Sequence, residues 1–234
     1  VGFILMIVHY AGSSRSATIF ATADILFGVW GSGPEDVFVV GYNGTIVHHD
    51  GEGWSSMSSG TSQHLQGVAG SGQNDVFAVG NSGTILHYDG SWSAMSSGTT
   101  ADWEGVWGSG ANDVFAVGNN GTILHYDGAS WSTMSSGTTV DLDGVWGSGA
   151  NDVFAVGNNG TILHYDGSLP WSAMSSGTTV DLQGVWGSGA NDVFAVGNSG
   201  TIVHYDGSSW SAMDSGTTED LDGVWGSGVS DVFG

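Results

Sequence analysis

The chain repeats one phrase of about 39 residues six times. A clear copy begins at Gly105 and reads GVWGSGANDVFAVGNNGTILHYDGASWSTMSSGTTVDLD. Its opening Gly-Val-Trp recurs from residues 28, 105, 144, 184 and 223, and Gly67-Val68-Ala69 is the one variant. A fixed period of this size indicates units that each form one supersecondary piece and bury their apolar faces only against neighbours. Residues 1–234 are therefore predicted to form a single repeat domain.

Within the unit from Gly144, turn-forming residues separate four short apolar runs. The runs cover residues 142–146, 152–156, 161–165 and 171–174, and they are rich in β-branched and aromatic residues. Asn159-Gly160, between the second and third runs, is typical of a hairpin turn in which both central residues have positive φ. Each unit is thus predicted to be a four-stranded antiparallel meander, with strands A to D in chain order.

Meanders of this length, repeated along a chain, predict an all-β fold and specifically a six-bladed β-propeller. Five repeats start at residues 28, 67, 105, 144 and 184. We expect the closing blade to be shared by the two ends, with residues 223–234 supplying strand A and most of B, and residues 1–27 supplying C and D. His9-Tyr10 aligns with His125-Tyr126 in this scheme. Sharing one blade would close the ring and remove both sheet edges. The apolar run at residues 3–8 is too short to span a bilayer and is predicted to be a strand.

The charge of the chain excludes several partners. Lysine is absent and Arg15 is the only cationic residue besides histidine, against 23 acidic residues and a formal charge of −22. Binding to nucleic-acid phosphates or to anionic membranes therefore lacks its usual cationic groups, so we expect no nucleic acid and no membrane insertion. Such a field concentrates cations and favours solubility. Without cysteine, disulfides and thiolate metal sites are excluded.

Two phrases, AVGNNGTILHYDGASW and GTTVDLDGVW, resemble propeller repeats of the Asp-box (BNR) sialidase-like superfamily. The closest likeness is to photosystem II assembly-factor-like repeats and their bacterial surface-protein relatives. The family's Asp-box lies between the third and fourth strands, and residues 125–131 resemble it with Asp127 and Trp131 in matching roles, although Gly128 directly follows the aspartate. The resemblance implies a propeller. Sialidases of this family hold the substrate carboxylate with three arginines, and Arg15 alone cannot supply them.

Two series of ring side chains recur once per unit. Imidazoles are common zinc ligands, but strand C lies roughly 10 Å outside the inner strand at ~4.8 Å per strand, so the histidines cannot converge and are predicted to be structural. The tryptophans of strands A and D are predicted to pack in the core, the outer ones with a methionine three residues later. The series are His9, His48, His87, His125, His164 and His204; Trp30, Trp107, Trp146, Trp186 and Trp225; Trp54, Trp92, Trp131, Trp171 and Trp210; and Met57, Met95, Met134, Met174 and Met213.

Two series of aspartates are predicted to hold Asx-type turns. They are Asp36, Asp75, Asp113, Asp152, Asp192 and Asp231, which open strand B, and Asp50, Asp89, Asp127, Asp166 and Asp206, which close strand C. Asp141-Leu142-Asp143 and Asp220-Leu221-Asp222 come nearest to a calcium loop, so weak calcium binding is the one cofactor hypothesis, without an assigned metal site. Asn43, Asn120 and Asn159 match glycosylation sequons but are predicted to be turn residues.

A catalytic centre needs residues that break the repeat symmetry, and those in this chain are scattered over different units. They are Arg15, Glu35, Tyr42, His49, Glu52, His64, Trp103 and Glu104. They show no spacing of nucleophile, base and orienting group, so no catalytic residue and no enzyme is predicted. The leading hypothesis is a secreted or surface-exposed propeller that binds a protein or carbohydrate ligand, including glycans, through many similar loops. The alternative is a structural subunit that self-assembles, as a homo-oligomer, into a surface array or filament.

Overall fold

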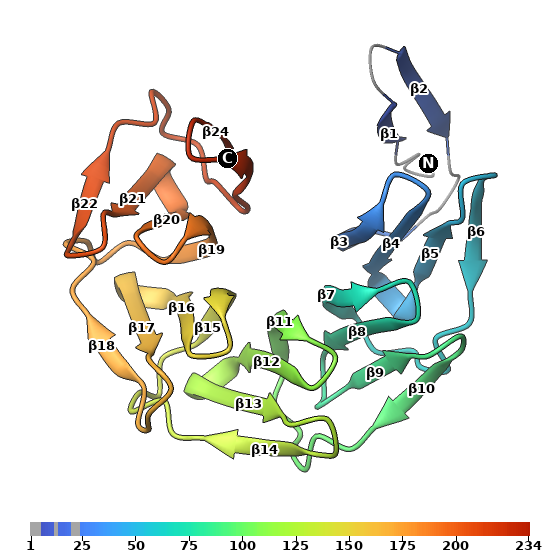
Figure 1. Cartoon of the computed structure of the whole chain (residues 1–234), viewed down its shortest axis with the longest axis horizontal. Helices are drawn as coiled ribbons and strands as arrows, with labels where there is room; N and C mark the ends of the chain where they lie inside the picture. The colour runs from blue at the N-terminus through green and yellow to red at the C-terminus, as the bar shows by residue number, and fades with distance from the viewer. Residues whose placement is uncertain (1–5, 12–13, 20–23) are drawn as a thin grey trace.

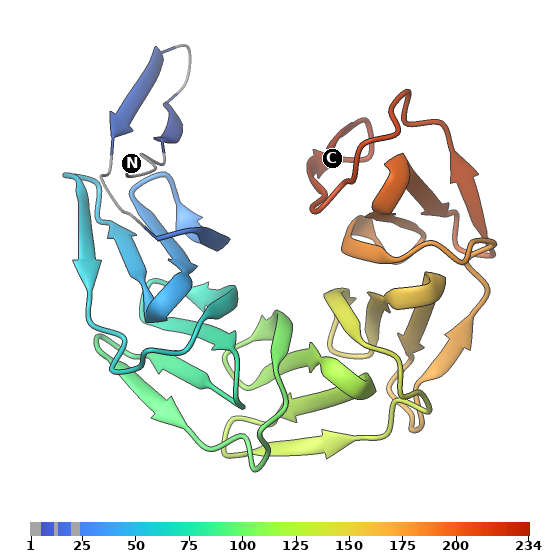
Figure 2. The ribbon, with the colours of Figure 1, turned by 180° about the vertical axis from the view of Figure 1, so that it is seen from behind.

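The computed structural model describes residues 6–11, 14–19 and 24–234, with side chains described from residue 24 onward. Short strands form sheets arranged like blades around a common centre, as Figures 1 and 2 show from opposite sides. The only helical segments described are three-residue 3₁₀ turns. None of them is long and apolar enough to cross a membrane.

Five antiparallel four-stranded sheets form the complete blades, and each follows the chain order of its strands. Blade 1 contains β3 (Leu26–Gly33), β4 (Asp36–Gly41), β5 (Ile46–His49) and β6 (Trp54–Met57). Blade 2 contains β7 (Leu65–Gly72), β8 (Asp75–Gly80), β9 (Ile85–Tyr88) and β10 (Trp92–Met95). Blade 3 contains β11 (Trp103–Gly110), β12 (Asp113–Gly118), β13 (Thr122–Tyr126) and β14 (Trp131–Met134). Blade 4 contains β15 (Leu142–Gly149), β16 (Asp152–Gly157), β17 (Thr161–Tyr165) and β18 (Ser172–Met174). Blade 5 contains β19 (Leu182–Gly189), β20 (Asp192–Gly197), β21 (Thr201–Tyr205) and β22 (Trp210–Met213).

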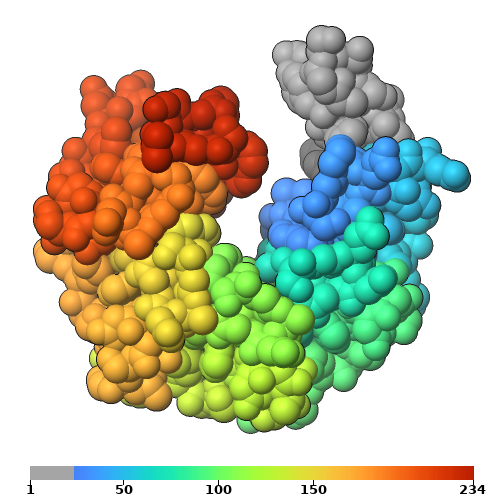
Figure 3. Space-filling model, viewed as in Figure 1, coloured from blue at the N-terminus to red at the C-terminus, as the bar shows by residue number. Residues whose placement is uncertain are grey.

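The two ends of the chain form separate two-stranded sheets. β1 (Met6–Ala11) pairs with β2 (Ser14–Ile19), and β23 (Trp225–Gly228) pairs with β24 (Asp231–Phe233). The predicted shared blade requires β24 to pair with β1, and among the described strands neither sheet makes that pair. The arc of blades is accordingly open between β23–β24 and blade 1, as Figures 1 and 3 show. The six-bladed closure is thus not found, while the four-stranded meander is confirmed.

The B–C turns have the backbone that the sequence predicts. Asn43 and Gly44 have φ values of 54° and 72°, and Asn120-Gly121 and Asn159-Gly160 repeat this pair of positive angles. Both central residues of such a turn must be left-handed, which glycine and asparagine tolerate best. The sequon asparagines are therefore turn residues, and the Asn43 amide donates to Asp24 Oδ1 at 3.0 Å.

The apolar core lies between successive blades rather than within one. Phe115, Val117 and Ile123 of blade 3 form a single buried cluster with Leu142 and Val153 of blade 4. Equivalent clusters join blade 1 to blade 2 and blade 4 to blade 5. The outer tryptophans Trp171 and Trp210 are buried members of these clusters, which confirms their predicted packing role. Each blade therefore depends on its neighbours for burial of its apolar faces.

The inner tryptophans join adjacent blades. A Cβ atom on Gly147 of blade 4 would lie 2.7 Å from Cη2 of Trp107 in blade 3, so the indole lies directly on the glycine. Trp30 packs in the same way on Gly70, and Trp146 on Gly187. The packing role predicted for this series is confirmed in these blades, and its physical basis is a glycine that admits the neighbouring ring.

Candidate interaction site

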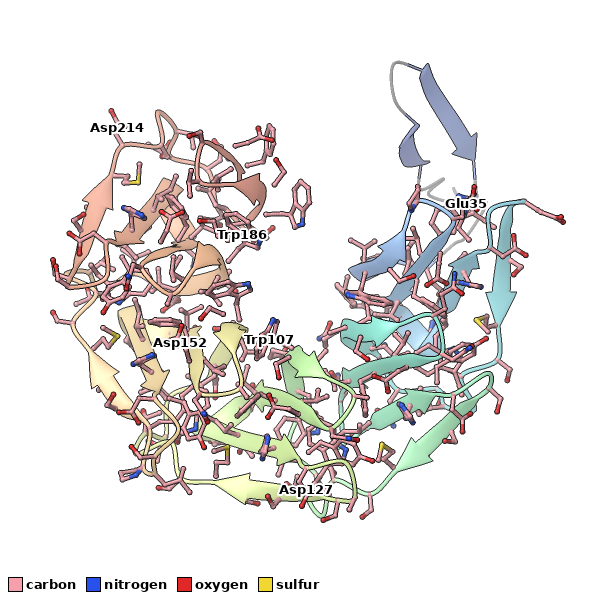
Figure 4. The ribbon with its side chains drawn as sticks, in the orientation of Figure 1. Glu35, Trp107, Asp127, Asp152, Trp186 and Asp214 are labelled. Carbon is pink, nitrogen blue, oxygen red and sulfur yellow. The ribbon has the colours of Figure 1, made fainter. Side chains whose placement is uncertain are left out.

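The Gly-Val pairs of the inner strands face the centre of the arc. Glycine allows close approach there, because a Cβ on Gly105 would lie 2.9 Å from the carbonyl oxygen of Asp143 in the next blade. Together these strands line a central hollow of about 610 Å³, and all five blades and the β23–β24 sheet contribute to it. Figure 4 places Trp107 and Trp186 on this inner side of the arc. The residues lining the hollow are Phe27, Gly28, Val29, Gly67, Val68, Gly105, Val106, Gly144, Val145, Gly184, Val185, Gly223, Val224, Trp225, Phe233 and Gly234.

Carboxylates precede these glycines in the middle of the arc and form an acidic rim, defined here as Asp102, Glu104, Asp141, Asp143 and Asp181. Burial, followed by repulsion from Glu104, Asp141 and Asp181, raises the pKa of Asp143 to about 6. The pKa of Glu104 is also raised, first by burial and then by the charges of Asp102 and Asp141. Asp143 Oδ2 is buried and has no hydrogen-bond partner among the residues that the structure describes. The rim therefore concentrates negative charge beside an apolar hollow, most strongly at Glu104 and Asp143.

Three rim aspartates also connect neighbouring blades. Asp141 Oδ1 accepts the backbone N–H of Asn120 at 2.7 Å, from the B–C turn of the preceding blade. Asp102 accepts from Ser82 and Asp181 from Asn159 in the same way, and Asp220 repeats the contact with Ser199. In blade 2, His64 Nδ1 accepts from Asn43 instead. The sequence analysis did not predict that these aspartates bind the B–C turn of the preceding blade. The available signal was an aspartate that recurs three residues before the Gly-Val pair of the inner strand.

The two Asp-Leu-Asp segments behave unlike a calcium loop. Leu142 is buried between Asp141 and Asp143, and one oxygen of Asp141 is already taken by a backbone N–H. Asp220 Oδ1 is occupied in the same manner by Ser199. Calcium binding at these segments stays a prediction.

The strand C histidines lie in a repeated Ser–Asp–His arrangement. In blade 4, Asp152 accepts a hydrogen bond from Ser148 Oγ at 2.5 Å and contacts His164 Nε2 at 2.7 Å. The imidazole also stacks on Phe154, with ring centroids 4.4 Å apart. The aspartate uses Oδ2 for the serine hydroxyl and Oδ1 for the imidazole, so one carboxylate holds both side chains in the sheet. The predicted structural role of this series is confirmed in the five complete blades.

The two series of aspartates differ in outcome. The turn predicted for the first series is corrected, and that predicted for the second is confirmed at Asp50, Asp127, Asp166 and Asp206. Asp36 and its equivalents do not hold Asx turns, because their carboxylates face across the sheet to serine and histidine. At the C–D turn, Asp127 Oδ1 accepts the backbone N–H groups of Ala129 and Ser130 at 2.9 Å each, as an Asx turn requires. Backbone N–H donors at Ser130 and Ala129 lower the pKa of Asp127. The backbone N–H of Ser209, followed by the hydroxyl and the backbone N–H of Ser208, lowers the pKa of Asp206 to about 2.

Polar hollows recur on the outer part of three blades. One of about 640 Å³ lies between the B–C turn at residues 120–122 and the segment 133–139, and its lining is rich in serine and threonine. Equivalent hollows of about 520 and 650 Å³ occur in blades 1 and 4. The same hydroxyl-rich surface is thus presented several times around the arc.

The symmetry-breaking residues do not converge on one centre. Trp103 is fully buried, and Glu104 belongs to the acidic rim. Tyr42 and His64 lie together, with ring centroids 4.0 Å apart, at the junction of blades 1 and 2. Figure 4 places Glu35 in blade 1, well away from the middle blades. The side chain of Arg15 lies outside the described residues.

These features define the class of protein as a β-propeller-type repeat chain. No family model matches the sequence, and no curated protein matches it. Among solved structures, the chain is similar to "YCF48 bound to D1 peptide", with a TM-score of 0.75 and 15% identity over 100% of this chain and 83% of that one. It is also similar to the WD40 β-propeller domain of Doa1, with a TM-score of 0.78 and 13% identity over 94% and 79% of the two chains. These neighbours support a propeller repeat architecture, without separate support for the Asp-box sialidase-like branch.

Proposed function

We propose that this chain is a non-enzymatic interaction module that binds basic, extended segments of other proteins at its central hollow. The observation that carries the proposal is the acidic rim beside an apolar surface to which every inner strand contributes. A cationic segment would relieve the repulsion among the rim carboxylates and cover exposed apolar side chains. The sequence analysis leaves two ligand classes open, protein and carbohydrate. The acidic rim beside an apolar hollow favours a protein ligand.

Two further observations support a binding role. The neighbouring structure YCF48 carries a bound D1 peptide, which is a property of that protein and makes peptide binding on this architecture reasonable. The repeated outer hollows give the chain several equivalent surfaces, so weak contacts can add through multivalency. We propose glycans as the second ligand class, at those hydroxyl-rich surfaces. We also propose, as the sequence-based hypothesis does, that the module lies outside the cell or on its surface, and its acidity favours solubility.

The test is calorimetric titration with three peptides of equal length that differ only in net charge. The basic peptide is expected to bind, and its affinity should fall steeply with added salt because rim charges are partly exposed. The combined variant Glu104→Gln/Asp143→Asn should weaken that binding about tenfold at low salt. Asp127→Asn is the matched control, since Figure 4 places Asp127 at the outer edge of the arc.

The acidic and neutral peptides distinguish recognition of positive charge from nonspecific binding. Equal binding of all three, or an unchanged affinity in the rim variant, would contradict the proposal. A glycan array on the same sample tests the outer hollows independently.

A further inference from the structure

The junction between blades 2 and 3 lacks an indole that the other described blade junctions contain. Trp107 of blade 3 lies on Gly147 of blade 4, on the inner side of the arc in Figure 4. Contacts of the same kind join blade 1 to blade 2, blade 4 to blade 5, and blade 5 to the β23–β24 sheet. Blade 2 carries Ala69 at the tryptophan position, and the three atoms nearest to a Cβ on the facing Gly108 all belong to blade 3. This junction thus has the receiving glycine without the ring.

The strand register shows that Ala69 occupies the tryptophan position. Ala69 pairs with Phe77 on the neighbouring strand, as Trp107 pairs with Phe115. The rings of Trp107 and Phe115 lie with their centroids 6.3 Å apart. Phe77 and Gly108 line a gap at the equivalent place in blades 2 and 3. They therefore form two walls of the space that an indole would fill.

The two blades have not moved together to close this gap. Across the junction of blades 2 and 3, a Cβ on Gly67 would lie 3.2 Å from the carbonyl oxygen of Glu104. The corresponding distance from Gly105 to the carbonyl oxygen of Asp143, where an indole is present, is 2.9 Å. The inner strands therefore keep their separation without the ring, and a place for one remains between them.

Trp103 does not fill the gap. It stands where other inner strands have a leucine, such as Leu142, and it is fully buried in a cluster with Val79 and Ile85. It is not among the residues that line the gap. The gap also opens to the surface, because Ala69 is partly exposed.

The polar side chains that line the gap are already paired. Asp75 Oδ2 accepts from Ser71 Oγ at 2.5 Å, and Asp75 Oδ1 contacts His87 Nε2 at 2.7 Å. The remaining lining is apolar or lacks a side chain, and consists of Ala69, Gly70, Phe77, Gly108, Gly110 and Val114. A narrow apolar gap of this kind favours a flat hydrocarbon ring over a charged ligand.

We propose that this gap is a binding slot for a tryptophan side chain of a partner polypeptide. The indole lies between Phe77 and Gly108, as Trp107 lies between Phe115 and Gly147. The molecule itself indicates the occupant, because an indole fills the equivalent place at the four other described junctions. Burial of the ring against apolar walls stabilises the complex through the hydrophobic effect.

The slot is distinct from the acidic rim but adjoins the central hollow. Ala69 directly follows Val68, which lines that hollow. A segment bound in the hollow is therefore well placed to insert one side chain into the slot. The inference goes beyond the proposed function and does not depend on it, because an uncharged indole needs no contact with Glu104 or Asp143.

Binding of an uncharged indole tests the slot without the charges of the rim. The probe is N-acetyltryptophanamide, titrated while NMR follows the methyl groups of Val114. The shifts should saturate with a dissociation constant on the order of 1 mM, as expected for a ligand of this size, and added salt should not weaken the binding. The leucine counterpart of the probe should bind more weakly, because it lacks the flat ring. Absence of saturable binding would overturn the proposal.

Two variants change the slot in opposite directions. Ala69→Trp fills it from within the chain and should abolish binding of the probe. Trp107→Ala is the matched opposite change, because it opens the equivalent slot on Gly147. This variant should bind two probes per chain, with new shifts at Val153, which pairs with Gly147 as Val114 pairs with Gly108.

Binding that survives Ala69→Trp, or a single probe per chain in folded Trp107→Ala, would contradict the slot. If Trp107→Ala does not fold, Gly108→Ala takes its place, because the added methyl group covers the glycine on which the indole lies. An affinity that Gly108→Ala leaves unchanged would overturn the assignment.

Uncharged peptides test whether a polypeptide supplies the ring. A peptide with a single tryptophan should bind more tightly than the same peptide with alanine in its place, and Ala69→Trp should remove the difference. Equal affinities would overturn a polypeptide source. The rim variant Glu104→Gln/Asp143→Asn should bind the tryptophan peptide as the unmodified chain does, so failure of the slot and failure of the rim are distinguishable.

A second copy of the chain is the other source of an exposed indole. Trp225 is 62% exposed, but two copies would approach each other with a formal charge of −22 each. Sedimentation should therefore show monomers at the concentrations of the titration. Dimers that disappear in Trp225→Ala would overturn the assignment of the slot to a different polypeptide.

Discussion

Trp186 lies against Gly226 of the following sheet, so that a Cβ atom on that glycine would stand 2.6 Å from the indole Cη2. The same pairing joins Trp107 to Gly147 and Trp146 to Gly187. In each case the indole of one inner strand packs directly on a glycine of the next inner strand. The contact therefore adds packing between neighbouring blades at the centre of the arc.

Replacing one of these glycines should loosen the junction between two blades. In Gly147→Ala, the new methyl group would lie 2.7 Å from both Trp107 Cη2 and the Asp152 carbonyl oxygen. Overpacking of this kind costs about 1–3 kcal/mol in free energy of unfolding. Gly149→Ala is the control, because nothing lies within 4 Å of its Cβ position. Urea titration should show a lower free energy of unfolding for Gly147→Ala only. Equal unfolding midpoints for the two variants would contradict the packing of Trp107 on Gly147.

Blade 2 lacks the inner-strand tryptophan, and introducing one should stabilise the fold. Ala69 stands at the tryptophan position, and the facing Gly108 meets no indole. A narrow gap remains there, lined by Ala69, Gly70, Phe77, Gly108 and Val114 among others. Ala69→Trp should restore the contact and raise the free energy of unfolding by about 1 kcal/mol. Adding Gly108→Ala should cancel the gain. If the gain in free energy of unfolding remains in the double variant, the indole introduced at position 69 does not pack on Gly108.

The Ser–Asp–His arrangement should stabilise each complete blade through its central carboxylate. Asp152→Ala removes the acceptor of both Ser148 and His164 and should cost about 2 kcal/mol. Ser148→Ala removes one partner at an exposed position and should cost about 0.5–1 kcal/mol. Thermal melts of the two variants at equal salt provide the comparison. A larger loss for the serine variant would contradict the central role of the aspartate.

The sequence predicted the strands well because each strand is encoded locally. The period, the Asn-Gly turns and the Asp127 turn all depend on residues within one repeat. The partner of Asp141, in contrast, is a backbone amide about half a repeat earlier, so the recurring aspartate does not by itself identify its partner. The turn role predicted for Asp36 is wrong because its partners, Ser32 and His48, meet it only after the sheet forms. Closure was not found for a similar reason, since curvature depends on packing between blades rather than on repeat length.

Mild acid should stabilise the fold through Asp143. Its pKa is raised from 3.8 to about 6, so the folded chain binds a proton more readily than the unfolded chain between those values. Stability should therefore increase as pH falls from 7 toward 5, whereas the Asp206 turn, with its pKa lowered to about 2, keeps its contribution in that range. Asp143→Asn should gain on the order of 1 kcal/mol at pH 7, allowing for solvent screening, and should flatten the pH dependence. An unchanged slope in the variant would contradict this assignment.

Added salt should stabilise the chain, because 23 acidic side chains face a single arginine and repel one another. Screening shortens that repulsion from a reach of ~8 Å at physiological ionic strength to ~3 Å at 1 M. The melting temperature should therefore rise between these conditions. Because sodium chloride also affects apolar burial, the Glu104→Gln/Asp143→Asn variant provides the control, and its melting temperature should rise less steeply. Calcium should act at lower concentration, and a chelator should reverse it, if the Asp-Leu-Asp segments bind this ion. A melting temperature that stays flat or falls with sodium chloride would show that the acidic charges are locally compensated.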